Sequence, residues 1–80
     1  MTATEMRSYV EASPFQRFVI HLADGRHIPV NHREFIFMSP SGRMIHVYED
    51  DDTLHVIDLY LVTGIELKPG RNSQRKSRKE

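Results

Sequence analysis

Apolar and polar residues alternate on both sides of Asp24-Gly25, and this pattern predicts a β-hairpin over residues 18–30. A two-residue turn would pair Ile20 with Pro29, whereas a type I turn followed by a glycine bulge pairs Ile20 with Ile28. Only the bulged register places the apolar residues on one face, so we expect it, with the glycine at positive φ. The residues expected to face inward are Phe18, Ile20, Leu22, Ile28 and Val30.

The second face of this hairpin carries His21 opposite His27. Pro29 lies on the same face and has no amide hydrogen to donate to a neighbouring strand. The nitrogen of Pro29 is therefore expected to face the edge of a sheet or a bulge.

Helical turns are predicted by residues that cap helix ends. Thr2 and Glu5 have the spacing of a capping box, which predicts a helix from Thr2. This helix is expected to end near Ala12, because the residue before a proline avoids helical geometry. Asn31 is expected to cap one helical turn, and Asp58 is expected to cap another turn over residues 59–62.

Short apolar runs separated by turn residues predict further strands at 35–38, 44–48, 53–57 and 65–67. Strands that are this short and this closely spaced favour antiparallel pairing over βαβ units. We expect a mainly β (α+β) fold, in which a short N-terminal helix packs on a small antiparallel sheet or partly open barrel of five or six strands.

Eighty residues predict a single small domain, and the charge divides the chain in two. Residues 1–67 carry five basic and ten acidic side chains, whereas residues 68–80 carry six basic and one acidic. We expect a folded domain over 1–68 and a disordered basic tail over 69–80, because the tail lacks apolar side chains to bury.

The chain has no cysteine, so it forms no disulfide, no cysteine-ligated zinc site and no thiol nucleophile. It also has no apolar run that could span a membrane and no secretory signal pattern. These features predict a cytoplasmic protein without contact with a membrane.

A series of short motifs over residues 14–67 resembles a family of small uncharacterised bacterial proteins. The motifs are Pro14-Phe15, Ile20-His21-Leu22-Ala23-Asp24-Gly25-Arg26, His32-Arg33-Glu34-Phe35, Ile57-Asp58-Leu59 and Val62-Thr63-Gly64-Ile65-Glu66. Arg17 and Arg33 stand where that family tends to have proline. The resemblance implies no activity. At the level of fold alone, the chain is also similar to Sm-like and SH3-like small barrels.

Five histidines raise the question of a metal site. His21 and His27 are expected to be cross-strand neighbours with His32 nearby, and two imidazoles with a carboxylate can bind Zn²⁺. His46 and His55 are expected to pair across adjacent strands. The chain has no established metal-binding spacing, so polar residues on a half-exposed face are the favoured interpretation, and we expect no metal and no cofactor.

Acidic residues offer two further candidates. The run Glu49-Asp50-Asp51-Asp52 could hold Ca²⁺ or Mg²⁺, but it lacks the ligand spacing of a calcium loop, so we expect a solvated hairpin loop. Asp58 could act in catalysis, but capping a turn through its side chain is the plainer role. The sequence contains no catalytic triad and no phosphate-binding glycine loop, so we expect no catalytic residue and no enzyme.

The function expected from the sequence is therefore a small module for protein–protein interaction or self-association. The alternative is a nucleic-acid-binding module that uses the basic tail, whose charges would give salt-sensitive affinity. The tail residues expected to contact nucleic acid are Arg71, Arg75, Lys76, Arg78 and Lys79. A tail that only keeps the protein soluble explains the same charges.

Overall fold

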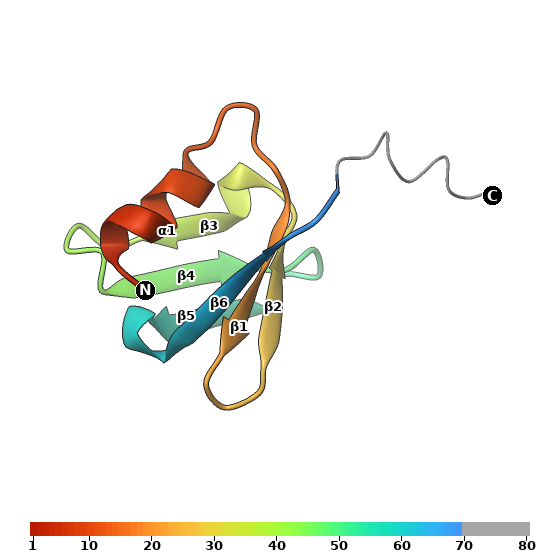
Figure 1. The fold of residues 1–80 in the computed structure, drawn as a ribbon. Coiled ribbons are helices and arrows are strands. Elements are labelled where there is room, and N and C mark those ends of the chain that lie inside the picture. The colour runs from red at the N-terminus through yellow and green to blue at the C-terminus, as the bar shows by residue number, and fades with distance from the viewer. Residues whose placement is uncertain (70–80) are drawn as a thin grey trace.

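The computed structural model describes residues 1–69, which form one α-helix, two 3-10 turns and six strands (Figure 1). The expected mainly β (α+β) fold with a short N-terminal helix is confirmed. The elements in chain order are α1 (Ala3–Val10), β1 (Phe18–Leu22), β2 (His27–Val30), η1 (Arg33–Phe35), β3 (Ile36–Met38), β4 (Met44–Tyr48), β5 (Leu54–Asp58), η2 (Leu59–Leu61) and β6 (Val62–Leu67).

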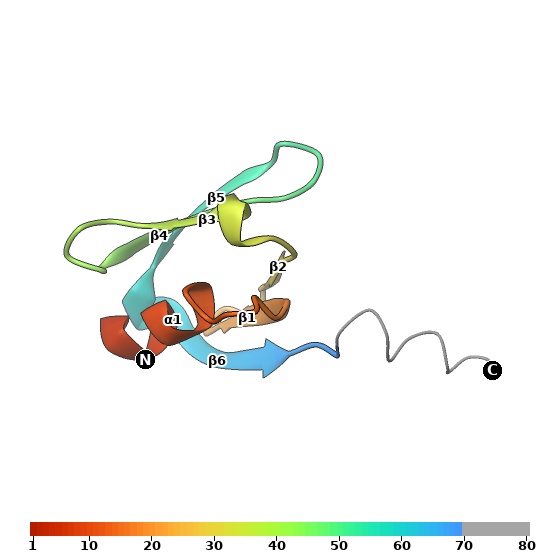
Figure 2. The ribbon, with the colours of Figure 1, turned by 90° about the horizontal axis from the view of Figure 1, so that it is seen from above.

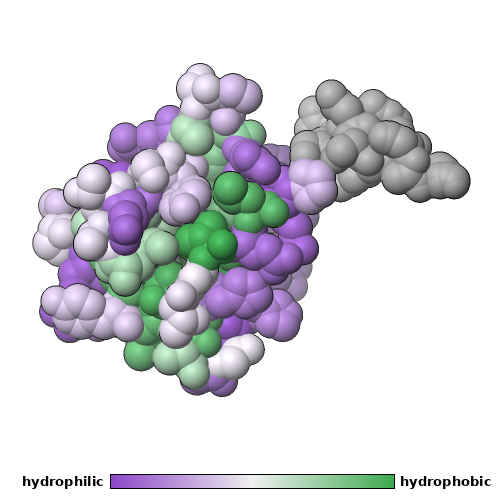
Figure 3. Space-filling model, in the orientation of Figure 1, coloured by the Kyte–Doolittle hydropathy of each residue, from purple (hydrophilic) through white to green (hydrophobic). Residues whose placement is uncertain are grey.

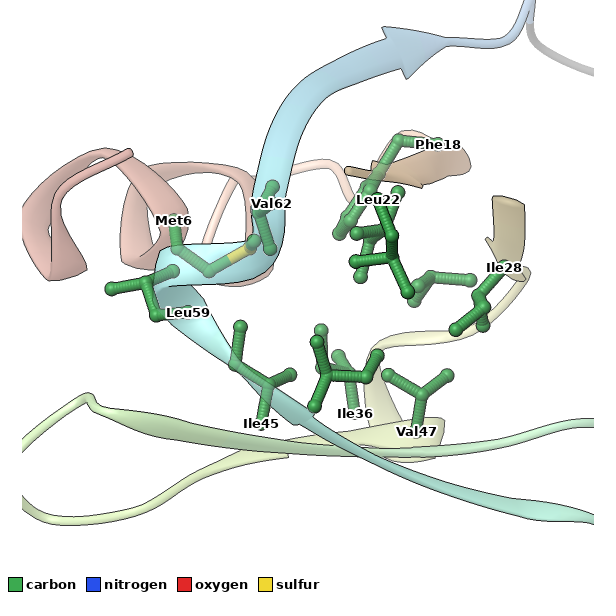
Figure 4. Close-up of a cluster of buried hydrophobic side chains, with 12 residues drawn as sticks. Met6, Phe18, Leu22, Ile28, Ile36, Ile45, Val47, Leu59 and Val62 are labelled. Atoms are coloured by element: carbon green, nitrogen blue, oxygen red, sulfur yellow. The ribbon is translucent and has the colours of Figure 1, made fainter. Parts of the chain in front are cut away.

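The strands form two antiparallel sheets with the orders β2-β1-β6 and β3-β4-β5. Seen from above, the two sheets face each other and α1 lies beside the first sheet (Figure 2). Apolar side chains from both sheets and from α1 fill the space between them (Figure 4). The buried core consists of Met6, Phe18, Ile20, Leu22, Ile28, Val30, Ile36, Ile45, Val47, Ile57, Leu59 and Val62.

The β1–β2 hairpin has the expected bulged register, in which Ile20 lies opposite Ile28. The Gly25 amide donates to the Leu22 carbonyl at 3.0 Å, and the Leu22 amide donates to the Arg26 carbonyl at 2.9 Å. Gly25 has φ +93°, a conformation that a side chain would strain. All five residues expected to face inward are buried, and β2 is an edge strand of its sheet, as Pro29 predicts.

The capping box of α1 is confirmed, since the Thr2 hydroxyl accepts from the Glu5 amide at 3.0 Å. The helix ends at Val10, with Glu11 as its C-cap, close to the end predicted near Ala12. The Arg33 guanidinium donates to the carbonyl oxygens of Val10, at 3.1 Å, and of Ala12. A side chain from a distant turn thus satisfies carbonyl groups at and just after the helix end.

Both predicted helical turns are present as η1 and η2, but only the predicted cap of η2 is confirmed. The Asp58 carboxylate accepts from the Tyr60 amide at 2.9 Å and caps η2, as expected. The cap of η1 was predicted wrongly, because its N-cap residue is His32 rather than Asn31 and makes no side-chain hydrogen bond. The last strand begins three residues earlier than predicted, because Val62 pairs with Leu22 across a β-bulge in which Thr63 of β6 is the extra residue.

No helix within residues 1–69 is long and apolar enough to cross a membrane. The predicted tail over 69–80 lies outside the described residues except for Pro69.

Candidate interaction surface

Large apolar side chains are exposed on the side of the β3-β4-β5 sheet that faces away from the core. The strand register places Phe37, His46 and Val56 in one row across this sheet, and Tyr48 and Leu54 in the next row. We call these five residues the outer patch. Their neighbours along each strand, such as Ile45 and Val47, point into the core.

The exposure of the outer patch is high for apolar groups. Phe37 is 55% exposed, Tyr48 39%, Leu54 43% and Val56 53%. The rings of Phe37 and Tyr48 meet edge to face, with centroids 6.5 Å apart. Contiguous exposed apolar side chains of this kind mark interaction surfaces in proteins, whereas single exposed residues do not.

Another apolar strip lies on the face that carries α1 and β6, with polar groups on both sides (Figure 3). Tyr9 and Val10 of α1 and Ile65 of β6 are only partly exposed, because they pack against the core. Their contacts are thus already used to hold the helix on the sheet. The outer patch has no such role, and it is the stronger candidate for binding another molecule.

The loop that joins β4 to β5 borders one end of the outer patch, beside Tyr48 and Leu54. We call Glu49-Asp50-Asp51-Asp52 the acidic loop. Glu49 is paired with His55, with 2.5 Å between Oε2 and Nε2. Asp51 accepts from the Thr53 amide at 3.0 Å, and its hydrogen bonds to Thr53 lower the pKa of its carboxyl. The loop is thus a structured hairpin turn in which the three aspartates are exposed to solvent.

At the opposite end of the β3-β4-β5 sheet, Arg43 and Asp58 form an ion pair with no net charge. The Arg43 guanidinium donates to the Asp58 carboxylate at 3.1 Å and lies over the Tyr60 ring, 4.4 Å from its centroid. The hydrogen bonds from Arg43 lower the pKa of Asp58 and keep this carboxyl ionised. Asp58 therefore has two local structural partners, which agrees with a capping role.

The structure brings His21 and His27 together, with ring centroids 5.9 Å apart. His21 Nε2 lies 2.9 Å from Glu66 Oε1, and Lys68 donates to the other Glu66 oxygen at 3.0 Å. These two contacts lower the pKa of Glu66. His32 contacts the Phe35 ring instead. Among residues 1–69, no three histidine, aspartate or glutamate side chains are grouped so that they could hold a metal ion.

The expected pairing of His46 with His55 is wrong. His46 lies opposite Val56, whereas His55 lies opposite Val47. The two histidines differ by one position in register, so they point to opposite faces of the sheet. His46 is exposed in the outer patch, and His55 is partly buried beside Glu49.

The sequence did not identify the outer patch. Phe35-Ile36-Phe37-Met38 is uniformly apolar and has no alternation to show that Phe37 faces solvent. The clearer signal was Met44 to Tyr48, where Ile45 and Val47 alternate with His46. The tail residues expected to contact nucleic acid, Arg71, Arg75, Lys76, Arg78 and Lys79, lie outside the described residues.

Comparisons with protein-family models, with curated proteins and with solved structures give no significant match.

The stability of the domain is expected to fall in acid. Five carboxyl groups have a lowered pKa because they accept hydrogen bonds in the folded state; they are those of Glu5, Asp24, Asp51, Asp58 and Glu66. The unfolded chain then binds more protons than the folded chain in acid. Their contribution is complete above the unfolded pKa values of about 4, and it is lost as the pH falls through the lower folded values.

Urea unfolding at a series of pH values between about 7 and 2 measures this effect, and the midpoint should decline below about pH 4. Asp58→Asn is the informative variant, because an amide oxygen still accepts from the Tyr60 amide but cannot ionise beside Arg43. Its midpoint should decline less steeply than that of the wild type. A wild-type midpoint that stays constant down to about pH 2 would contradict the assignment.

Proposed function

We propose that this protein is a non-enzymatic interaction module of the cytoplasm, which binds a protein partner through the outer patch. The observation that supports this proposal is the exposed edge-to-face pair of Phe37 and Tyr48, next to Leu54 and Val56. Aromatic side chains are enriched at protein interfaces, because they contribute a large contact area at a low entropic cost.

The location of the patch agrees with this proposal. Its side chains stand on the ordered strands of a sheet rather than on loops, so they are held in place before a partner arrives. A preorganised surface loses little conformational entropy on binding. The fold-level similarity to Sm-like and SH3-like barrels, and the resemblance to the bacterial family, remain predictions and name no partner.

Nucleic-acid binding remains an alternative that depends on the basic tail. The folded part disfavours it, because residues 1–67 carry twice as many acidic as basic side chains and would repel phosphates. Under this alternative, the full-length chain would bind RNA or DNA at low salt, and the binding would weaken as salt is added.

Affinity capture with the full-length chain tests the proposal. Proteins retained by the wild type are compared with those retained by Phe37→Ser and by the control Leu67→Ser, an exposed leucine on β6 with 49% exposure. We expect a partner whose recovery falls by about tenfold with Phe37→Ser alone, the loss typical of one interface aromatic. Equal recovery with all three proteins, together with a monomer by light scattering, would overturn the proposal.

A further inference from the structure

The open edge of β5 lies directly beside the outer patch. The Glu49 amide donates to the Thr53 carbonyl at 2.9 Å, and the Leu59 amide donates to the Arg43 carbonyl at 2.8 Å. These two bonds show which residues of β5 bond to β4. In an antiparallel pair only every second residue exchanges backbone hydrogen bonds with the partner strand, so the odd-numbered residues of β5 bond to β4. The amide and carbonyl groups of Leu54 and Val56 therefore point away from β4, toward the edge.

This edge lacks the features that usually protect an edge strand. Natural sheets block such edges with proline, lysine, bulges or very short strands. The edge strand β2 contains Pro29, and the edge strand β3 has only three residues. In contrast, β5 has five residues, an even ladder with β4, and exposed apolar side chains at Leu54 and Val56.

The outer patch alone is small for a stable complex. Four half-exposed side chains of this size offer roughly 400 Å² of apolar surface, whereas a stable interface buries about 800 Å² on each partner. An added strand would supply backbone hydrogen bonds to the β5 edge as well as contacts with Leu54 and Val56. A partner that binds as a strand therefore compensates for the small area of the patch.

The charges at the two ends of the β5 edge indicate which side chains a partner strand should carry. The acidic loop lies at the Leu54 end of β5, and no ion pair within residues 1–69 uses Asp50, Asp51 or Asp52. The other end of the edge carries Asp58, which is neutralised by Arg43. A partner strand with lysine or arginine at the end beside the acidic loop would match this charge distribution.

A second copy of β5 fits this edge less well. If two β5 strands paired antiparallel with Val56 at the two-fold axis, Leu54 of one copy would lie opposite Asp58 of the other. With His55 at the axis, Leu54 would lie opposite Val56, but Asp58 would meet Asp52 of the other copy's acidic loop. Each acidic loop would then approach the end of the partner strand that carries Asp58, where Arg43 is already paired with that carboxylate. An apolar side chain opposite a carboxylate in the first register, and two carboxylates opposite each other in the second, disfavour this pairing.

We infer that the β5 edge binds an extended segment of a protein partner, which has apolar residues at alternate positions and basic residues beside the acidic loop. This inference rests on the proposed function and names the chemistry of the partner. The segment adds a strand to the β3-β4-β5 sheet, bonds to the backbone of Leu54 and Val56, and covers their side chains.

A phage-displayed library of random dodecapeptides, selected on the full-length chain, tests the inference. The selected peptides should combine alternating valine, isoleucine or aromatic residues with lysine or arginine at one end. A synthetic peptide of the selected sequence should slow hydrogen exchange at the amides of Leu54 and Val56 in the wild-type protein, measured by NMR. This measurement needs no variant, and unchanged exchange at both amides would overturn the inference.

Val56→Pro removes the outward amide hydrogen without removing a bond to β4, and it should weaken peptide binding by about tenfold or more. The matched control is His27→Pro, because the His27 amide points outward at the β2 edge and lies in the other sheet.

Changing Asp50 and Asp52 together to asparagine should weaken binding at low salt and flatten its salt dependence. Retained affinity in both Val56→Pro and the double variant would overturn the inference.

Other outcomes separate this inference from the proposed function. Selected peptides without basic residues would show that the β5 edge binds a strand of different chemistry. A wild-type dimer that Val56→Pro converts to a monomer would show that a second copy of the chain occupies the edge. Either result would overturn the inference of a basic partner strand. If a captured partner is lost with Phe37→Ser but retained with Val56→Pro, the outer patch functions and the strand addition does not occur.

Discussion

Phe18→Ala is expected to leave much of the protein unfolded near 37 °C. Phe18 is 1% exposed, and its ring lies 6.0 Å from that of Tyr9 and 5.8 Å from that of Phe15. It therefore joins α1 and the segment after it to the first sheet. Truncation of a buried phenylalanine to alanine costs about 3–5 kcal/mol. The whole stability of a chain of this length is about 4–12 kcal/mol, so the loss is a large part of it.

Urea unfolding followed by circular dichroism measures this loss, and Phe37→Ala is its matched control. The same atoms are removed, but Phe37 is 55% exposed and loses mainly its edge contact with Tyr48. We expect a loss of less than about 1 kcal/mol for Phe37→Ala. Equal losses at the two positions would contradict the assignment of Phe37 to a solvent-exposed face.

The β1–β2 hairpin could be predicted in detail because its signals are local and agree with one another. Asp24-Gly25 restricts the turn, and the alternation from Phe18 to Leu22 decides between the two registers. The capping box of Thr2 with Glu5 and the cap at Asp58 are equally local, since each partner lies within three residues. Interactions at this separation can be read from spacing alone.

The details that the sequence did not predict depend on distant contacts. The guanidinium that bonds to the end of α1 belongs to Arg33, which lies 23 residues from Val10 in the chain. The orientations of His46 and His55 depend on a register offset of one residue between β4 and β5. Spacing within one segment contains no information about such contacts, because they arise only when the segments pack.

The outer patch was missed for a related reason. Apolar residues such as Phe37 and Val56 resemble core residues in the sequence, and only the sheet order shows that they face solvent. Hydrophobic periodicity predicts which residues share a face but not which face is covered. An interaction surface made of core-like residues therefore becomes visible only once the fold is known.

Gly42→Ala is expected to destabilise the protein by about 2–5 kcal/mol, for two separate reasons. Gly42 has φ +79°, a conformation that costs roughly 1–2 kcal/mol for an alanine. A Cβ atom there would also lie 2.5 Å from the Cβ of Ala3, the first residue of α1. The helix or the turn between β3 and β4 must then move, and overpacking of this kind costs about 1–3 kcal/mol more.

Gly25→Ala isolates the first of these reasons, because Gly25 has φ +93° but nothing lies within 4 Å of an added Cβ. Its expected loss is about 1–2 kcal/mol, which urea unfolding can compare directly with that of Gly42→Ala. Adding Ala3→Gly to Gly42→Ala removes the clashing Cβ, so the double variant should be more stable than the two separate losses would predict. Strict additivity, or equal losses at Gly25 and Gly42, would contradict the close contact between α1 and this turn. The combined result would show whether the helix is held against the β3–β4 turn by shape as well as by the capping box and the apolar contacts of Met6.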